Sequence, residues 1–131
     1  MRRLTPTCVL LATLAVLAVP VAAPGQDAGS GPTAQASARR CHLSVREQRH
    51  LGTTYVTSLS VRITTCRNAK RIVRAYHACR RVHGGKDGRC TGVFGYRCRE
   101  RRFNKSRLSY DARARCAKGA RRVWHTYTQN L

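Results

Sequence analysis

Apolar and polar positions alternate between Tyr55 and Ile63, and this is the clearest pattern in the chain. An alternation with a period of two predicts a β-strand with one buried face. Thr57 fills one place in the inward phase, and Val56 is the only apolar residue outside that phase. The apolar residues that we expect to face inward are Tyr55, Leu59, Val61 and Ile63.

The period changes at Cys66 from that of a strand to that of a helix. Apolar residues fall on one side of this helix, at Cys66, Ala69, Ile72, Val73, Tyr76, Cys79 and Val82. Basic residues fall on the other side, at Arg67, Lys70, Arg71, Arg74 and Arg81. Thr64 or Thr65 can cap the start of the helix, and Gly84-Gly85 ends it. The pattern predicts an amphipathic helix that packs by its apolar side.

Three further strands are predicted after a glycine-rich turn at residues 83–88. Alternation runs from Phe94 to Cys98 and from Leu108 to Cys116, with a charged loop at residues 100–107 between them. Residues 123–128, rich in aromatic and β-branched side chains, form a closing strand. A short helix within residues 41–51 can be added. The predicted fold is α+β, with one amphipathic helix packed on a small antiparallel sheet in the order β-α-β-β-β.

The N-terminal residues have the pattern of an export signal. Arg2 and Arg3 precede an uncharged apolar run from Val9 to Val19, which is too short to span a bilayer as a helix. We expect a signal peptide over residues 1–23, with cleavage between residues 23 and 36. Residues 24–38, mostly Gly, Ala, Ser, Pro, Gln and Thr, predict a disordered leader. Residues 39–131 then form a single basic, disulfide-rich domain.

Six cysteines remain outside the signal peptide, at Cys41, Cys66, Cys79, Cys90, Cys98 and Cys116. An even number in an exported domain predicts three disulfides. Cys66 and Cys79 lie ~20 Å apart along the predicted helix, so they cannot pair with each other. We expect Cys79 to pair with Cys90 across the glycine-rich turn and Cys66 to pair with Cys98 or Cys116 on the sheet. Cys41 takes the remaining partner.

The chain is strongly basic, with 26 Lys and Arg, five Asp and Glu and a formal net charge of +21. Such a surface attracts polyanions and anionic membranes, although an arginine-rich composition is an alternative explanation. If Cys98 and Cys116 face the helix, guanidinium groups and an indole share the other face of the sheet, where phosphates or stacked bases could bind. The alternative is an ordinary solvated sheet face. The candidate anion-binding residues are Arg97, Arg99, Arg113, Arg115, Arg122 and Trp124.

Histidine offers the main route to catalysis. Two histidines beside a cation could perform acid-base chemistry on a phosphodiester. His125, next to Trp124 and amid arginines, is the first candidate, with His77 or His83 as its partner. A metal site that uses Cys79 and His83 is disfavoured, because export favours disulfides over zinc and no paired CxxC motif is present. We expect neither a metal nor a cofactor.

Three short motifs mark the predicted elements, and they are Cys66-x-x-Ala69 in the helix, Gly95-Tyr96-x-Cys98 in a strand and Cys116-x-x-Gly119 at a hairpin. Over roughly residues 55–127 the chain resembles small secreted cysteine-containing proteins of actinobacterial type. It departs from their simplest pattern in carrying Cys41, Cys79 and Cys90 as well. The resemblance implies export and this fold, and it brings no catalytic residue.

These features predict a secreted, noncatalytic domain that binds an anionic extracellular partner. The partner is a wall polymer, a nucleic acid or an anionic membrane surface. We expect a monomer that is extracellular or associated with the cell wall. Two alternatives stay open. One is a secreted ribonuclease-like enzyme, and the other is a small protease inhibitor whose loop at residues 100–107 enters a partner's active site.

Overall fold

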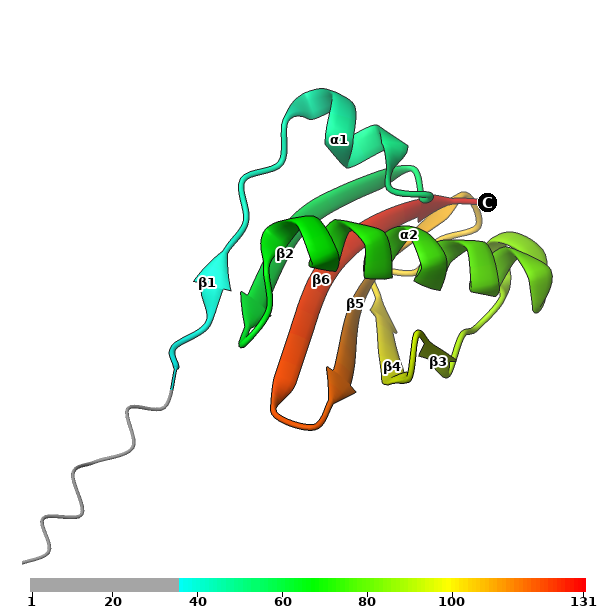
Figure 1. The fold of residues 1–131 in the computed structure, drawn as a ribbon. Coiled ribbons are helices and arrows are strands. Elements are labelled where there is room, and N and C mark those ends of the chain that lie inside the picture. The colour runs from blue at the N-terminus through cyan, green and yellow to red at the C-terminus, as the bar shows by residue number, and fades with distance from the viewer. Residues whose placement is uncertain (1–35) are drawn as a thin grey trace, which may run out of the picture. The chain divides into compact units, whose positions relative to one another are not determined.

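Helix α2 lies across one face of a six-stranded antiparallel sheet, as Figure 1 shows. The computed structural model describes residues 36–131, so the expected signal peptide and most of the expected leader lie outside the described residues. The strand order is β1-β2-β6-β5-β4-β3. The elements are β1 (Arg39–Arg40), α1 (Val45–His50), β2 (Tyr55–Arg62), α2 (Cys66–Val82), the 3-10 helix η1 (Gly85–Asp87), β3 (Gly92–Val93), β4 (Tyr96–Phe103), β5 (Ser109–Lys118) and β6 (Arg121–Asn130).

The predicted α+β class is confirmed, and the sheet is larger than predicted. β1 and β3 each contain two residues and extend the two edges of the sheet. A strand of two residues is too short to show a period in the sequence. The four predicted strands correspond to β2, β4, β5 and β6.

Helix α2 starts and packs as its sequence requires. The Thr65 hydroxyl accepts a hydrogen bond from the Asn68 backbone amide, which caps the first turn. Ala69, Ile72, Val73 and Tyr76 are buried against the sheet. Val82 was expected on the same side, but it is 79% exposed. It is the last helical residue and lies one position before the C-cap, where the helix no longer packs on the sheet.

A β-bulge in β2 reverses the phase expected for its first half. Val56 pairs with Tyr127 and Ser58 pairs with Thr126, so Thr57 is an extra residue on this strand. Val56 is therefore buried and Tyr55 is exposed, which is the opposite of the expectation. After the bulge, Leu59 and Val61 are buried as expected, whereas Ile63 lies beyond the strand and is 49% exposed.

The expected loop at residues 100–107 is wrong in its first half. β4 continues to Phe103, and Glu100 and Arg102 pair with Ala114 and Ala112 of β5. Both charged side chains point toward α2. Because the inward positions of this segment are charged rather than apolar, its sequence does not show the alternation of a strand. Only residues 104–108 connect the two strands, which shortens the loop available to the inhibitor alternative.

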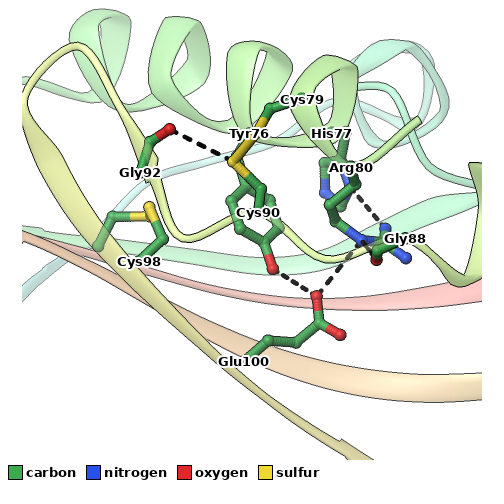
Figure 2. Close-up of a disulfide and its surroundings, with 10 residues drawn as sticks. Tyr76, His77, Cys79, Arg80, Gly88, Cys90, Gly92, Cys98 and Glu100 are labelled. Atoms are coloured by element: carbon green, nitrogen blue, oxygen red, sulfur yellow. Dashed lines mark hydrogen bonds and ion pairs between the residues drawn. A yellow bond between two sulfur atoms is a disulfide. The ribbon is translucent and has the colours of Figure 1, made fainter. Parts of the chain in front are cut away.

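Three disulfides join these elements, as expected for an extracellular protein. Cys79 pairs with Cys90 as predicted, and Figure 2 shows this bond beneath the end of α2. The expected pairing of Cys66 with Cys98 or Cys116 is wrong. Cys98 and Cys116 are opposite each other on β4 and β5, with Cα atoms 4.1 Å apart, and bond to each other.

Cys66 bonds instead to Cys41, which follows the edge strand β1. The backbone amide of Cys41 donates to the Leu59 carbonyl at 2.8 Å, which holds Cys41 beside β2 and near the start of α2. No helix among residues 36–131 is long and apolar enough to cross a bilayer.

Candidate functional site

The sheet face that points away from α2 is the candidate site, and we call it the open face. Side chains alternate along each strand, so the buried cysteines of β4 and β5 point toward α2 and the residues between them point outward. The six residues predicted from sequence as an anion-binding group all lie on this face. They are Arg97, Arg99, Arg113, Arg115, Arg122 and Trp124.

Arginines lie directly opposite one another across the strands of the open face. Like charges in register on neighbouring strands are destabilising, so this arrangement costs the folded state stability. Arg101 and Arg62 belong to the set and were missed from sequence; Arg101 had been placed in a loop, although it continues the alternation of Arg97 and Arg99. The opposed pairs are Arg99 with Arg115, Arg101 with Arg113, and Arg62 with Arg122.

Acidic residues do not neutralise these arginines. Glu47 pairs with Lys70 at 2.5 Å, and Asp87 and Glu100 pair with inward-facing arginines. Asp111 lies at one end of the open face and accepts hydrogen bonds from Thr128 and Asn104, which lower its pKa. Among the described residues, therefore, no outward arginine of β4, β5 or β6 forms an ion pair.

Two hollows lie on the open face between the arginine side chains. The first, of about 260 Å³, is lined by Arg97, Arg99, Arg115 and Ala117. The second, of about 220 Å³, is lined by Arg101, Phe103 and Arg113. Guanidinium groups bind phosphates with paired hydrogen bonds, so each hollow has the chemistry of a phosphate site.

Trp124 lies near the middle of the open face. On β6 it is in register with Arg115 of β5 and Ser60 of β2. Its side chain is half-buried. Its register neighbour on β2, Ser60, is a small residue that covers little of the indole. Its neighbour His125 points to the other face and is 1% exposed, so the expected grouping of His125 with Trp124 and the arginines is wrong. Adjacent residues of a strand point their side chains to opposite faces of the sheet.

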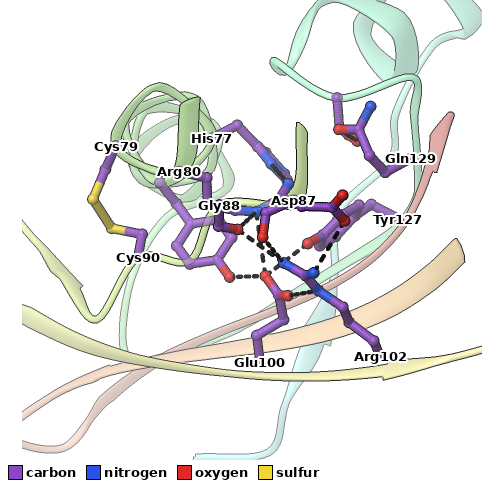
Figure 3. A network of polar contacts seen from close by, with 12 residues as sticks. His77, Cys79, Arg80, Asp87, Gly88, Cys90, Glu100, Arg102, Tyr127 and Gln129 are labelled. Atoms are coloured by element: carbon purple, nitrogen blue, oxygen red, sulfur yellow. Dashed lines mark hydrogen bonds and ion pairs between the residues drawn. A yellow bond between two sulfur atoms is a disulfide. The ribbon is translucent and has the colours of Figure 1, made fainter. Parts of the chain in front are cut away.

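The other face of the sheet carries a buried polar group that we call the core cluster. Its centre is the Glu100 carboxylate, whose side chain is 3% exposed. Glu100 accepts hydrogen bonds from the Tyr76 hydroxyl, from the Tyr127 hydroxyl at 2.7 Å and from Arg102 Nε at 2.5 Å. Arg80 Nε lies 3.3 Å from the same carboxylate. Figure 3 shows the Glu100 carboxylate among Arg80 of α2, Arg102 of β4 and Tyr127 of β6.

Arg80 is the second centre of the core cluster, and it is 2% exposed. Its Nε donates to the Gly88 carbonyl at 3.0 Å, and Nη2 donates to the Lys86 carbonyl at 2.7 Å and to the Tyr110 hydroxyl. Its Nη1 lies 3.0 Å from Nδ1 of His77. Arg80 thus ties the last turn of α2 to the segment that follows it. Its partners His77, Lys86 and Gly88 are close in sequence. Its contacts with Tyr110 and Glu100 come from the sheet, and the amphipathic pattern of the helix did not point to this buried charge.

The core cluster keeps Glu100 ionised. Burial by itself raises the pKa of a carboxyl, but hydrogen bonds from Tyr76 and Tyr127 and the charges of Arg80 and Arg102 lower the pKa of Glu100 below its ordinary value. Burial raises the pKa values of the Tyr76 and Tyr127 hydroxyls, and their hydrogen bonds to Glu100 raise these values further. Glu100 is therefore the shared counterion of Arg80 and Arg102 inside the fold.

Two of the candidate catalytic histidines meet beside the core cluster. The rings of His77 and His125 lie 5.2 Å apart, with 0% and 1% of their surfaces exposed. Burial lowers the pKa of His77 to about 2 and that of His125 to about 3. Both histidines are neutral and have no open side for a polymer. His83, the other proposed partner, is an exposed residue at the end of α2.

Cys79, Cys90 and Cys98 are all bonded in disulfides, so none of them offers a thiolate to the metal site considered above. No family model, curated protein or solved structure matches the chain. The resemblance to small secreted proteins of actinobacterial type therefore stays a prediction.

Proposed function

We propose that this protein is a secreted, noncatalytic domain whose open face binds phosphate-bearing polyanions outside the cell or at the cell wall. The observation that supports it most is the set of opposed arginine pairs on an uncovered sheet face. Such pairs repel each other in the free protein. A phosphate between two guanidinium groups removes this repulsion and accepts hydrogen bonds from both.

The distribution of charge supports the same proposal. The acids at positions 47, 87 and 100 each pair with a cation away from the open face. The open face therefore keeps its positive charge across neighbouring strands, which is the arrangement that concentrates a polyanion at a surface. The buried positions of His77 and His125 lend no support to the ribonuclease alternative.

Binding of inorganic polyphosphate to the oxidised protein over a salt series tests the proposal. Displacement of counterions makes the logarithm of the affinity fall linearly with the logarithm of the salt concentration. We expect the variant with Arg113→Glu and Arg115→Glu to bind at least about tenfold more weakly than the unchanged protein, because it removes one member of two opposed pairs.

The matched control carries Arg67→Glu and Arg74→Glu, which change the net charge equally on the exposed side of α2. This control should keep most of the affinity. Equal losses in the two variants would mean that net charge alone drives binding and would contradict a site on the open face. RNA incubated with the protein should stay intact; cleavage that disappears in a His125→Leu variant would contradict the noncatalytic role.

A further inference from the structure

The aromatic residues of the described chain differ in what covers their rings. Tyr76, Tyr110 and Tyr127 lie in the core. Among the more exposed rings, Arg49 lies over Tyr55 and Arg71 lies over Phe94. No guanidinium lies over the ring of Trp124 in the described residues. The indole of Trp124 and the ring of Phe103 are thus the aromatic surfaces of the open face over which no cation lies in the described residues.

Folding alone does not explain a tryptophan at this position. The open face has no second layer on which an indole could pack, and the residues beside Trp124 in register are Arg115 and Ser60. A half-buried indole amid arginines leaves part of its apolar surface exposed to the solvent. Nucleic-acid bases stack on such surfaces, and binding sites for single strands combine stacking aromatics with a basic groove.

The arginines around Trp124 are placed to follow a phosphate chain. Arg115, its register neighbour, lines the first hollow with Arg97 and Arg99. The second hollow, lined by Arg101 and Arg113, adds another half-buried aromatic ring, that of Phe103. Outward positions on one strand repeat every ~6.6–6.8 Å, which is close to the separation of successive phosphates in an extended polynucleotide.

We infer that the polyanion bound by the open face is a single-stranded nucleic acid, with a base stacked on Trp124 and phosphates held by the arginines that line the two hollows. This inference rests on the proposed function and adds to it the class of ligand. A duplex keeps its bases stacked inside the helix, so it cannot use the indole. A wall polymer of alternating phosphate and polyol has no base to stack, so it uses the arginines alone.

Trp124 also provides the measurement, because it is the only tryptophan of the chain. Its fluorescence is recorded while an oligothymidylate, an abasic sugar-phosphate oligomer of equal length, a DNA duplex and inorganic polyphosphate are each added. We expect the oligothymidylate to quench the fluorescence and to bind about tenfold or more tightly than the abasic oligomer. Quenching by the abasic oligomer or by polyphosphate should be small.

Two variants separate stacking from charge, with binding followed by the anisotropy of labelled oligomers. Trp124→Leu keeps an apolar side chain without a ring, and it should lose the preference for the oligothymidylate while its affinity for polyphosphate stays unchanged. Trp124→Tyr keeps a ring and should retain the preference. Both changes lie outside the core, so both variants should fold.

The outcomes distinguish this inference from the proposed function. Equal affinity for the oligothymidylate and the abasic oligomer, with polyphosphate binding still lost on reversal of Arg113 and Arg115, would overturn the single-strand inference and leave the polyanion site standing. Tighter binding of the duplex than of the single strand would overturn it as well. If no polyanion binds at low salt, both proposals are wrong.

Discussion

Arg101 and Arg102 are neighbours on β4, yet their side chains lie on opposite faces of the sheet and in opposite electrostatic surroundings. Arg102 points toward α2, lies 2.5 Å from the Glu100 carboxylate, and donates to the Asp87 and Gly88 carbonyls at 2.8 Å each. Arg101 points outward and faces Arg113. Two residues of one type, adjacent in sequence, thus have a structural role and a candidate binding role.

This difference shows how a chain with few acids divides them. The acids that the fold needs are placed where a buried guanidinium requires a counterion, since an unpaired buried charge is costly. No acid pairs with the outward arginines of β4, β5 or β6 in the described residues, and solvent and dissolved ions screen their mutual repulsion. Removing a charged residue from the core cluster should therefore destabilise the fold. Removing a charge from the open face, or binding an anion there, should stabilise it.

The strongest response should be that of the buried histidines to acid. His77 and His125 stay neutral in the folded protein down to pH values of about 2 and 3, because their pKa values are lowered by burial. In the unfolded chain both accept protons below about pH 6.5. The unfolded state thus binds more protons, and the free energy of unfolding should fall as pH falls from about 6.5, by up to ~2.7 kcal/mol per pH unit for two protons.

Chemical denaturation at pH values from 7 to 5 measures this slope above the titration range of the carboxylates. A His125→Leu variant should show about half the slope, since one proton is removed from the balance. A free energy of unfolding that stays constant over this range would contradict neutral, buried histidines. Polyphosphate affinity of the folded protein should change little, because neither histidine lies on the open face.

The next effect comes from removing the charge at the centre of the core cluster. Glu100→Gln leaves Arg80 and Arg102 without their shared counterion and should lower the free energy of unfolding by about 3–5 kcal/mol. The control is Asp111→Asn at the open face, where the carboxylate is near solvent and the loss should be about 0.5 kcal/mol or less. Denaturant titration compares the two variants, and equal losses would mean that the core cluster adds no stability of its own.

A smaller loss is expected from the disulfide that closes the segment beside the core cluster. Replacement of both Cys79 and Cys90 by Ala frees the chain that presents the Gly88 carbonyl to Arg80, and it should cost ~2–4 kcal/mol. At low temperature the folded variant should bind polyphosphate with unchanged affinity, because this disulfide lies on the side of α2. A matching loss of affinity would show that the two faces are not independent.

The smallest effect should have the opposite sign. Arg115→Thr removes the repulsion with Arg99, and threonine suits a strand, so the free energy of unfolding should rise by ~0.2–1 kcal/mol at low salt. The gain should shrink at high salt, where the repulsion is screened. Thermal unfolding at two salt concentrations measures both. Destabilisation at low salt would mean that Arg115 contributes packing that outweighs its charge.

Short-range patterns predicted most of the fold but little of its charge pairing. Helix α2, the strand at β5 and the Cys79 to Cys90 disulfide follow from period and spacing, which are local properties. The bulge at Thr57 and the length of β4 could not be predicted in this way, because each depends on the strand that pairs with it. The connectivity of Cys98 with Cys116 depends on the same register.

Composition and local pattern alone fix the excess of arginine, the alternation that divides side chains between two faces, and the six cysteines that can form three disulfides. Which arginines have an acidic partner follows from the packing of the helix on the sheet and from the strand register. Glu100 reaches Arg80 through contact between α2 and β4, whereas Arg99 and Arg115 meet through strand register without an acid. The number of charged residues can be read from the sequence. Whether an arginine has an acidic partner depends on the distance between the two groups, which is set by the packing of segments far apart in sequence.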